Sequence, residues 1–147
     1  MLSSAFTTSE ILSLLQDHGM RLTQPRRVIV DEVQRRDRPF SAEELYGDLT
    51  LTHPGIGRAT VFRTLDVLAQ LQVLDRVHLP DGCHSYVLGQ GRGRHYHHLI
   101  CSTCGVVVPF EGCTIEPLLA SLGRTTEFEI SGHMLEVFGT CGNCRAA

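Results

Sequence analysis

Apolar residues recur at the three-to-four-residue spacing of amphipathic helices through the first 70 positions of the chain. One such stretch follows Ser9 and stops at Gly19, a residue type that commonly ends helices. A second helix is expected to begin near Pro25, and a third after Ser41, which forms a capping-box sequence with Glu44. The residues expected to face the interior are Ile11, Leu12, Leu14, Leu15, Val28, Ile29, Val33, Leu45, Tyr46 and Leu49.

A fourth helix and a hairpin follow the break at residues 53–55. The segment GRATVFRTLDVLAQL places Val61, Leu65 and Leu68 on one helical face. The segments LDRVHL and CHSYVL then read as two strands joined by a turn at residues 80–82. This order of elements, four helices followed by a two-stranded wing, predicts a winged helix-turn-helix unit.

The predicted turn decides which side chains of the wing share a face. A two-residue turn at residues 81–82 puts His84 on the side of Asp75, about 13 Å away along the strand. The same turn puts Cys83 on the other side, beside His78. A metal site that uses both His84 and Asp75 would therefore require the wing to bend.

The second part of the chain differs in composition from the first. All six cysteines and five of the eight histidines lie beyond residue 80. A length of 147 residues allows one domain or two small ones, and the formal net charge of −3 does not by itself indicate nucleic-acid binding. We expect a cytoplasmic protein with reduced thiols, because the sequence shows neither an apolar signal peptide nor a run as long as a membrane span.

Two C-x-x-C motifs, Cys101/Cys104 and Cys141/Cys144, each surround a predicted tight turn. Four thiolates at this spacing can complete the tetrahedral shell of a structural zinc ion. A reducing compartment disfavours disulfides, and a thioredoxin-type redox centre would need only one such pair at the start of a helix. The sequence therefore predicts a four-cysteine zinc site that couples zinc binding to folding.

Side chains at the start of the fourth helix are the candidate DNA contacts. In a winged helix-turn-helix unit the later helix of the pair enters the major groove, where its N-terminal side chains reach base edges or phosphates. Arg58, Thr60 and Arg63 occupy that position, and Arg21 is a candidate for contacts with the backbone or the minor groove. The alternative is that these arginines are ordinary solvent-exposed residues on a helix face and bind nothing.

The segments GMRLTQPR, TVFRTL, HLICSTCG and GTCGNC together resemble the ferric uptake regulator family across nearly the whole chain. The resemblance implies a homodimeric, metal-dependent transcription regulator that binds a double-stranded DNA operator. It also implies an α+β fold with a winged-helix DNA-binding domain at 1–88, a hinge at 89–94 and an α/β dimerisation domain at 95–147. Metal at the hinge would set the spacing of the two DNA-binding heads. Phe62 stands where the family usually has a tyrosine in the recognition helix, which removes any contact through that hydroxyl.

The histidine-rich segment at residues 95–98 predicts metal ligands on both faces of a strand. Alternation along a strand sends His95 and His97 to one face. By resemblance, Glu116 and His133 complete a regulatory zinc site on this face, with ligands that can hold zinc tetrahedrally. The alternative is that these histidines are surface polar residues beside a flexible loop.

The other face of this strand carries Tyr96 and His98 and departs from the family pattern. Tyr96 takes the place of a common histidine ligand, and Gly89 stands where zinc-responsive relatives often carry cysteine. We therefore expect wing residues to complete a regulatory site at the hinge. The expected ligands are His98 with Cys83 or His84, and the alternates are Asp75, His78 and Glu111.

One further thiol, Cys113, lies near a predicted strand-to-helix junction. It is interpreted as a small buried apolar residue in a core with Phe110 and Leu118, because lone cysteines usually pack in this way. The alternative is an additional metal ligand.

Zinc-responsive repression of zinc uptake and homeostasis genes is the function these features favour. The cysteine beside the wing, the abundance of histidine and the cysteine-rich ending are similar to zinc uptake regulators, and they imply Zn2+ at one structural and one or two regulatory sites. Fe2+ or Mn2+ sensing is the alternative, as is peroxide sensing, because carboxylate and imidazole ligands also suit those ions. Neither an enzyme nor a small-molecule substrate is expected, since the H-x-E and P-C-x-x-C motifs of zinc deaminases are absent from the sequence. A purely structural zinc ribbon would leave the winged helix and the histidines without a role.

Overall fold

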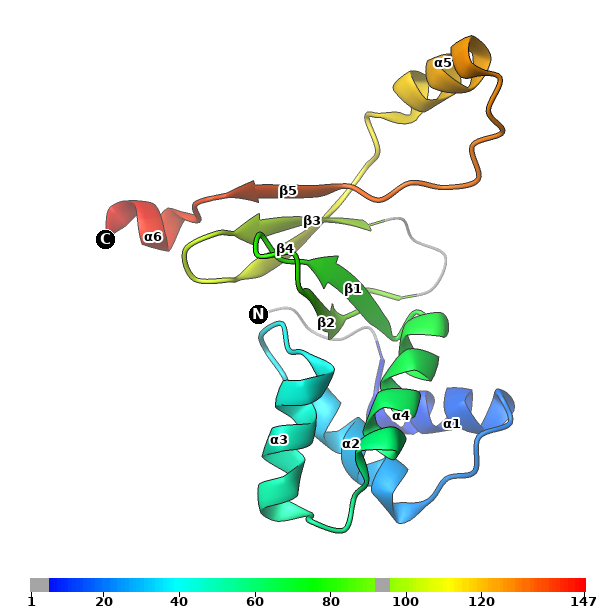
Figure 1. Ribbon diagram of the computed structural model, residues 1–147, viewed down its shortest axis with the longest axis vertical. Helices are drawn as coiled ribbons and strands as arrows, with labels where there is room; N and C mark the ends of the chain where they lie inside the picture. The colour runs from blue at the N-terminus through cyan, green and yellow to red at the C-terminus, as the bar shows by residue number, and fades with distance from the viewer. Residues whose placement is uncertain (1–5, 92–95) are drawn as a thin grey trace. The chain divides into compact units, whose positions relative to one another are not determined.

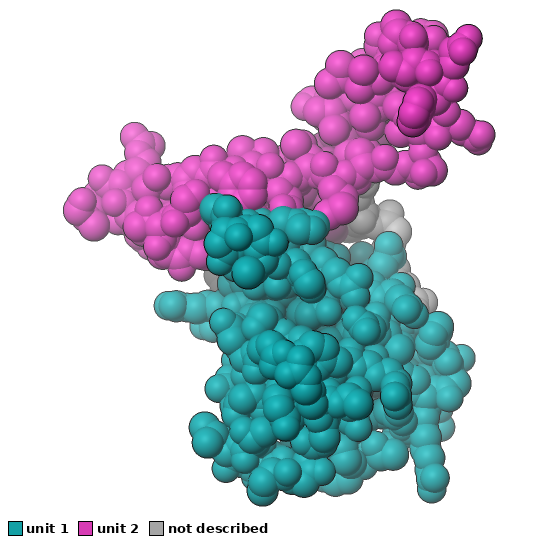
Figure 2. Space-filling model, viewed as in Figure 1, with its two compact units in different colours: residues 1–93 teal, residues 94–147 magenta. Residues whose placement is uncertain are grey.

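The computed structural model describes residues 6–91 and 96–147 (Figure 1). His95 and part of the predicted hinge lie outside the described residues. The chain divides into two compact units, residues 1–93 and 94–147 (Figure 2). No helix within the described ranges has the length and apolar character needed to cross a membrane.

The N-terminal unit contains four helices followed by a hairpin (Figure 1). These elements are α1 (Thr8–Asp17), α2 (Gln24–Gln34), α3 (Ala42–Thr52), α4 (Arg58–Gln70), β1 (Leu74–His78) and β2 (His84–Leu88). Their apolar faces form one core, as the helical spacing predicts. Nine of the predicted inward residues are at most 2% exposed, namely Ile11, Leu15, Ile29, Val33, Leu45, Leu49, Val61, Leu65 and Leu68.

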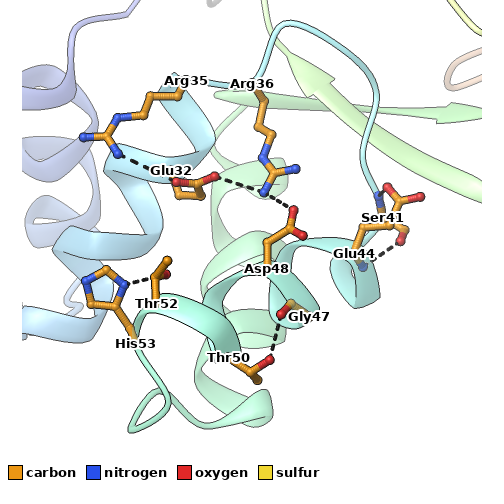
Figure 3. A network of polar contacts seen from close by, with 10 residues as sticks. All are labelled: Glu32, Arg35, Arg36, Ser41, Glu44, Gly47, Asp48, Thr50, Thr52 and His53. Atoms are coloured by element: carbon orange, nitrogen blue, oxygen red, sulfur yellow. Dashed lines mark hydrogen bonds and ion pairs between the residues drawn. The ribbon is translucent and has the colours of Figure 1, made fainter.

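Two of the helices, α1 and α3, begin with capping boxes. In α3 the Glu44 N–H donates to the Ser41 hydroxyl at 3.1 Å, and the Ser41 N–H donates to the Glu44 carboxylate at 2.9 Å, as predicted (Figure 3). Thr7 caps α1 in the same way, with Glu10 three residues later, so the apolar pattern that follows Ser9 lies inside this helix.

Arg36 joins α2 to α3. Its guanidinium donates to Glu32 of α2 at 3.0 Å and to Asp48 of α3 at 2.7 Å (Figure 3). Its Cζ also lies 5.6 Å from the centre of the Phe40 ring. The Arg36 side chain is 21% exposed and that of Asp48 is 56% exposed, so this network links α2 to α3, the helix that precedes α4, through a contact that is partly open to water.

The wing is an antiparallel hairpin in which His78 pairs with His84. The Leu79 N–H also donates to the Cys83 carbonyl at 2.7 Å, which leaves a loop of three residues, 80–82, of which the last is a glycine with φ of +84°. The predicted two-residue turn is therefore wrong, and so is the face assignment that depends on it. His84 shares a face with His78, and by alternation Cys83 falls on the face of Asp75.

Gly89 allows the end of β2 to lie close to the backbone that follows α4. Its N–H donates to the Val73 carbonyl at 2.8 Å. A Cβ at Gly89 would lie 2.7 Å from the carbonyl oxygen of Gln72, closer than real Cβ atoms approach. A cysteine side chain at position 89 would therefore require this backbone to shift.

We predict that Gly89→Ala lowers the free energy of unfolding of the N-terminal unit by about 1–3 kcal/mol, since the added methyl group must displace backbone atoms. The matched control is Gly47→Ala in α3, where an added Cβ meets nothing within 4 Å. This control should stabilise the unit by about 0.5–1 kcal/mol, as removing glycine from a helix interior does. Urea unfolding followed by circular dichroism measures both effects, and a Gly89→Ala midpoint equal to wild type would contradict the close approach.

The C-terminal unit contains a three-stranded sheet in the order β4-β3-β5. Its elements are β3 (Tyr96–Cys101), β4 (Val107–Glu111), α5 (Glu116–Thr126), β5 (Glu136–Gly139) and α6 (Gly142–Ala146). The central strand, β3, is antiparallel to β4 and parallel to β5. Among the described residues of this unit, the buried ones are His97, His98, Ile100, Cys101 and Val107. So small a core indicates that this unit depends on metal binding or assembly for stability.

Candidate metal centres and nucleic-acid interface

The four cysteines of the two C-x-x-C motifs come together in the C-terminal unit, with all sulfur atoms within 4.8 Å of one another. Cys101 ends β3, and Cys104 lies in the turn that follows. Cys141 caps α6, and Cys144 lies within that helix. The second motif, predicted to surround a turn, therefore begins a short helix.

The spacing of these sulfurs fits a zinc ion and does not fit a disulfide. The Sγ atoms of Cys104 and Cys141 are 3.7 Å apart. A disulfide would bring them to about 2.0 Å. Two ligands that each lie about 2.3 Å from a tetrahedral zinc would be about 3.8 Å apart. The donor set and its spacing therefore fit the predicted structural zinc.

The pKa values of the cysteine thiols also indicate that this cluster favours a bound cation. Backbone N–H groups of Cys104 and Cys141 donate toward the sulfur of Cys101, the latter at 3.3 Å, and lower its pKa to about 5. The neighbouring sulfurs of Cys141 and Cys104 raise the pKa of Cys144 to about 12. Four thiolates so close together repel one another, and a divalent cation removes that repulsion.

A second group of donor atoms is formed by His97, Cys113 and His133, again within 4.8 Å of one another. The Cys113 sulfur lies 3.2 Å from Nε2 of His133, and the His97 and His133 ring centres are 5.3 Å apart. The interpretation of Cys113 as a buried apolar residue is wrong. Its side chain is only half-buried and contacts an imidazole, while Leu118, its expected core neighbour, is 57% exposed.

The predicted partners of this group are only partly brought together. His97 and His133 meet as expected, whereas His95 lies outside the described residues. Glu116 is the first residue of α5, as predicted, and lines a shallow depression of about 390 Å³ together with His133. Glu116 is not among the three residues whose donor atoms lie within 4.8 Å, where Cys113 is found instead. The sequence did offer one sign that Cys113 could approach the metal ligands: it lies three residues before Glu116, at the corner between strand and helix.

The opposite face of the sheet carries a different polar pair. The Tyr96 hydroxyl donates to the Glu111 carboxylate at 2.9 Å. His98 is 8% exposed and lies in register with Glu136 of β5. The predicted alternation is confirmed for Tyr96, which pairs with Glu111 while His97 contacts His133. At this position tyrosine orients a carboxylate by hydrogen bonding.

The first turn of α4 presents the predicted DNA-contacting side chains. The Arg58 guanidinium donates to both carboxylate oxygens of Glu43, one of them at 2.8 Å, and its Cζ lies 4.5 Å from the centre of the Phe62 ring. Arg63 is exposed and Thr60 is half-buried. Phe62 thus supports Arg58 through its ring face, which requires no hydroxyl. Glu43 was not singled out from the sequence, because its partner lies 15 residues away.

Arg21 is exposed in the segment before α2. Its carbonyl accepts a hydrogen bond of 2.6 Å from the Arg26 guanidinium. The Arg21 side chain is therefore accessible from solvent, as a contact with the DNA backbone requires.

Comparison with known proteins agrees with this arrangement. A sequence model described as the ferric uptake regulator family matches residues 17–138. The ferric uptake regulation protein of Bordetella parapertussis is 34% identical over 134 residues, which cover 90% of this chain and 95% of that protein. A solved zinc uptake regulator complexed with zinc and DNA gives a TM-score of 0.74 at 25% identity, covering 96% of this chain and 97% of that chain. The ferric uptake regulator of Francisella tularensis with iron gives 0.65 at 26% identity, covering 86% and 96%. The chain therefore belongs to the ferric uptake regulator family of metal-responsive transcription regulators, which are not enzymes.

Proposed function

We propose that this protein is a zinc-responsive repressor that acts in the cytoplasm as a homodimer and controls genes of zinc uptake and homeostasis. The observation that carries the proposal is the thiol of Cys113 beside the imidazoles of His97 and His133. Thiolate ligands favour zinc over iron and manganese. Similarity to a zinc uptake regulator complexed with zinc and DNA supports the same assignment.

An iron-responsive regulator is the second candidate. The Bordetella parapertussis relative is a ferric uptake regulation protein. Carboxylates also lie close to the proposed metal ligands, since Glu116 lines the depression beside His133. Oxygen ligands suit iron and manganese better than they suit zinc.

The proposed metal sites have separate roles. The four-cysteine site would hold a structural zinc ion that stabilises the C-terminal unit. Regulatory zinc would bind on the face of His97 and His133, with His95 and Glu116 as further ligands. A second regulatory ion would link His98 to the wing and stabilise the arrangement of the two units that fits DNA, because a ligand shifts an equilibrium toward the state it binds more tightly.

The corrected register of the wing changes the ligands proposed for the hinge. His84 lies directly across the hairpin from His78. Directly paired residues have Cβ atoms about 5 Å apart, close enough for one ion. Cys83 and Asp75 share a face but lie four residues apart along the strands, which is about 13 Å. We therefore favour His84 and His78 with His98, and Cys83 or Asp75 as the alternatives.

The homodimer accounts for the exposed apolar surface of the C-terminal unit. Ten large apolar side chains there are between 38% and 73% exposed, namely Leu99, Val106, Val108, Leu118, Leu122, Phe128, Ile130, Met134, Val137 and Phe138. In the described part of the N-terminal unit, the corresponding exposed residue is Leu51. Apolar surface of this extent is characteristic of an interface between subunits.

The proposal is tested by selecting DNA from a random duplex pool in parallel with protein that carries regulatory Zn2+, Mn2+ or anaerobic Fe2+. We expect one sequence with two related half-sites to be enriched with zinc. Enrichment only with iron would favour the second candidate. The absence of enrichment with any of the three ions would contradict metal-dependent DNA binding.

We predict that Glu43→Gln strengthens DNA binding at low salt and steepens the dependence of log affinity on log salt concentration by about 1, because Arg58 becomes free to neutralise one more phosphate. The matched control is Asp66→Asn, which removes the carboxylate paired with Arg76 at 2.9 Å elsewhere in the same unit. Fluorescence anisotropy of a labelled duplex at several salt concentrations measures both slopes. A slope unchanged from wild type would show that Glu43 does not compete with DNA for Arg58.

A further inference from the structure

We propose that Cys113 is itself a metal ligand, and that with His97 and His133 it forms a thiolate-containing zinc site in the C-terminal unit. The inference deepens the proposed function. It rests on that function only for the claim that zinc at this site controls DNA binding. It replaces the purely imidazole and carboxylate site expected from the sequence with one that contains a soft sulfur ligand.

The fold brings the three donors together from segments that lie far apart in the sequence. His97 lies on the central strand β3, is 2% exposed and packs against the Phe110 ring at 5.5 Å. His133 lies in the segment that leads into β5. Cys113 follows the end of β4, just after Gly112, whose φ of +94° is a backbone conformation that favours glycine. The turn at Gly112 thus leads into the residue whose sulfur contacts His133.

The distances are close to those of a tetrahedral zinc site. With zinc about 2.3 Å from sulfur and about 2.0–2.1 Å from nitrogen, the two ligand atoms would be about 3.6 Å apart. The Cys113 sulfur and His133 Nε2 are 3.2 Å apart. A shift of about 0.4 Å would therefore admit the ion at the ideal angle.

A hydrogen bond from the Cys113 thiol to His133 would also give a short contact, but it would involve only one imidazole. Here the ring of a second, almost fully buried histidine, His97, lies beside the first. Two imidazoles and a thiol in one small group are the ligand types that zinc prefers. Glu116 lines the depression beside His133 but does not belong to the group of donors within 4.8 Å, so water or an inward movement of Glu116 would supply the fourth ligand.

The test uses Co2+ as a spectroscopic substitute for zinc in the full-length dimer, with the four-cysteine site kept filled by zinc and checked by metal analysis. Thiolate bound to Co2+ gives a charge-transfer band in the near ultraviolet, whereas imidazole and carboxylate ligands give none. We expect the added Co2+ to produce this band in wild type and in Cys83→Ser, and not in Cys113→Ser. Competition with a chromophoric chelator should show zinc affinity at this site reduced about tenfold or more in Cys113→Ser.

Two results would overturn the inference. One is the absence of the thiolate band from wild type, which does not depend on whether any variant folds. The other is a band that disappears in Cys83→Ser and persists in Cys113→Ser, which would assign the thiolate to the wing. DNA binding with and without regulatory zinc, measured on the same wild-type protein, separates this inference from the proposed function. Metal-dependent DNA binding without the thiolate band would refute ligation by Cys113, and with it the main ground for preferring zinc, but would leave a metal-dependent DNA-binding regulator standing.

Discussion

Cys144→Ser is expected to release the structural zinc and unfold the C-terminal unit. Structural zinc contributes about 10–16 kcal/mol of apparent binding free energy in small zinc domains. A whole domain is typically stable by only about 5–15 kcal/mol. The described part of this unit has few buried residues, and neither α5 nor β5 contains one. Loss of one thiolate therefore removes more stability than the small core can replace.

Native mass spectrometry should show a monomer without chelator-resistant zinc. Hydrogen exchange should show that the C-terminal unit has lost its protection. The N-terminal unit should retain its protection from exchange, because its core contains no metal ligand that we propose. Cys83→Ser is the matched control, since Cys83 is an exposed thiol in the wing. A Cys144→Ser protein that remains a folded dimer would refute the structural role of the four-cysteine site.

The double variant Leu118→Glu/Leu122→Glu is expected to convert the dimer to monomers. Both leucines lie on α5, four residues apart and so on one face of the helix, and are 57% and 44% exposed. Burying two carboxylates in an apolar interface costs several kcal/mol, so the dimer dissociates. DNA affinity should fall by about 100-fold or more, because two separate monomers lose the effective concentration that dimerisation gives the second half-site.

Leu51→Glu is the matched control for this pair of substitutions. Leu51 is 85% exposed but lies on α3 of the N-terminal unit. Analytical ultracentrifugation should show Leu51→Glu as a dimer and the double variant as a monomer with intact zinc. A dimeric double variant would show that this face of α5 is not part of the interface.

The N-terminal unit could be predicted closely from the sequence because its signals are local. The capping box of Ser41 and Glu44 lies within four residues. The core positions of α4 recur at helical spacing and are fully buried. The exception in this unit is the wing, where the predicted turn was one residue too short.

The features that were missed depend on conformation or on distant contacts. One additional residue in the loop at 80–82 reversed the faces of the wing, since side chains alternate along a strand. Cys113 meets His133 from 20 residues away, and Glu43 meets Arg58 from 15 residues away. Neither pairing follows from the spacing of residues within one element.

The most direct test of zinc-responsive DNA binding is the affinity of the wild-type dimer for the selected duplex as free metal is increased through a chelator buffer. Fluorescence anisotropy would report affinity, and native mass spectrometry would count the metal ions at each step. We predict that affinity stays low while only the structural zinc is bound, then rises about 10- to 100-fold as further zinc binds. Mn2+ and anaerobic Fe2+ should not produce this rise. An affinity that does not change when further zinc binds, or that rises with iron or manganese in place of zinc, would contradict the assignment.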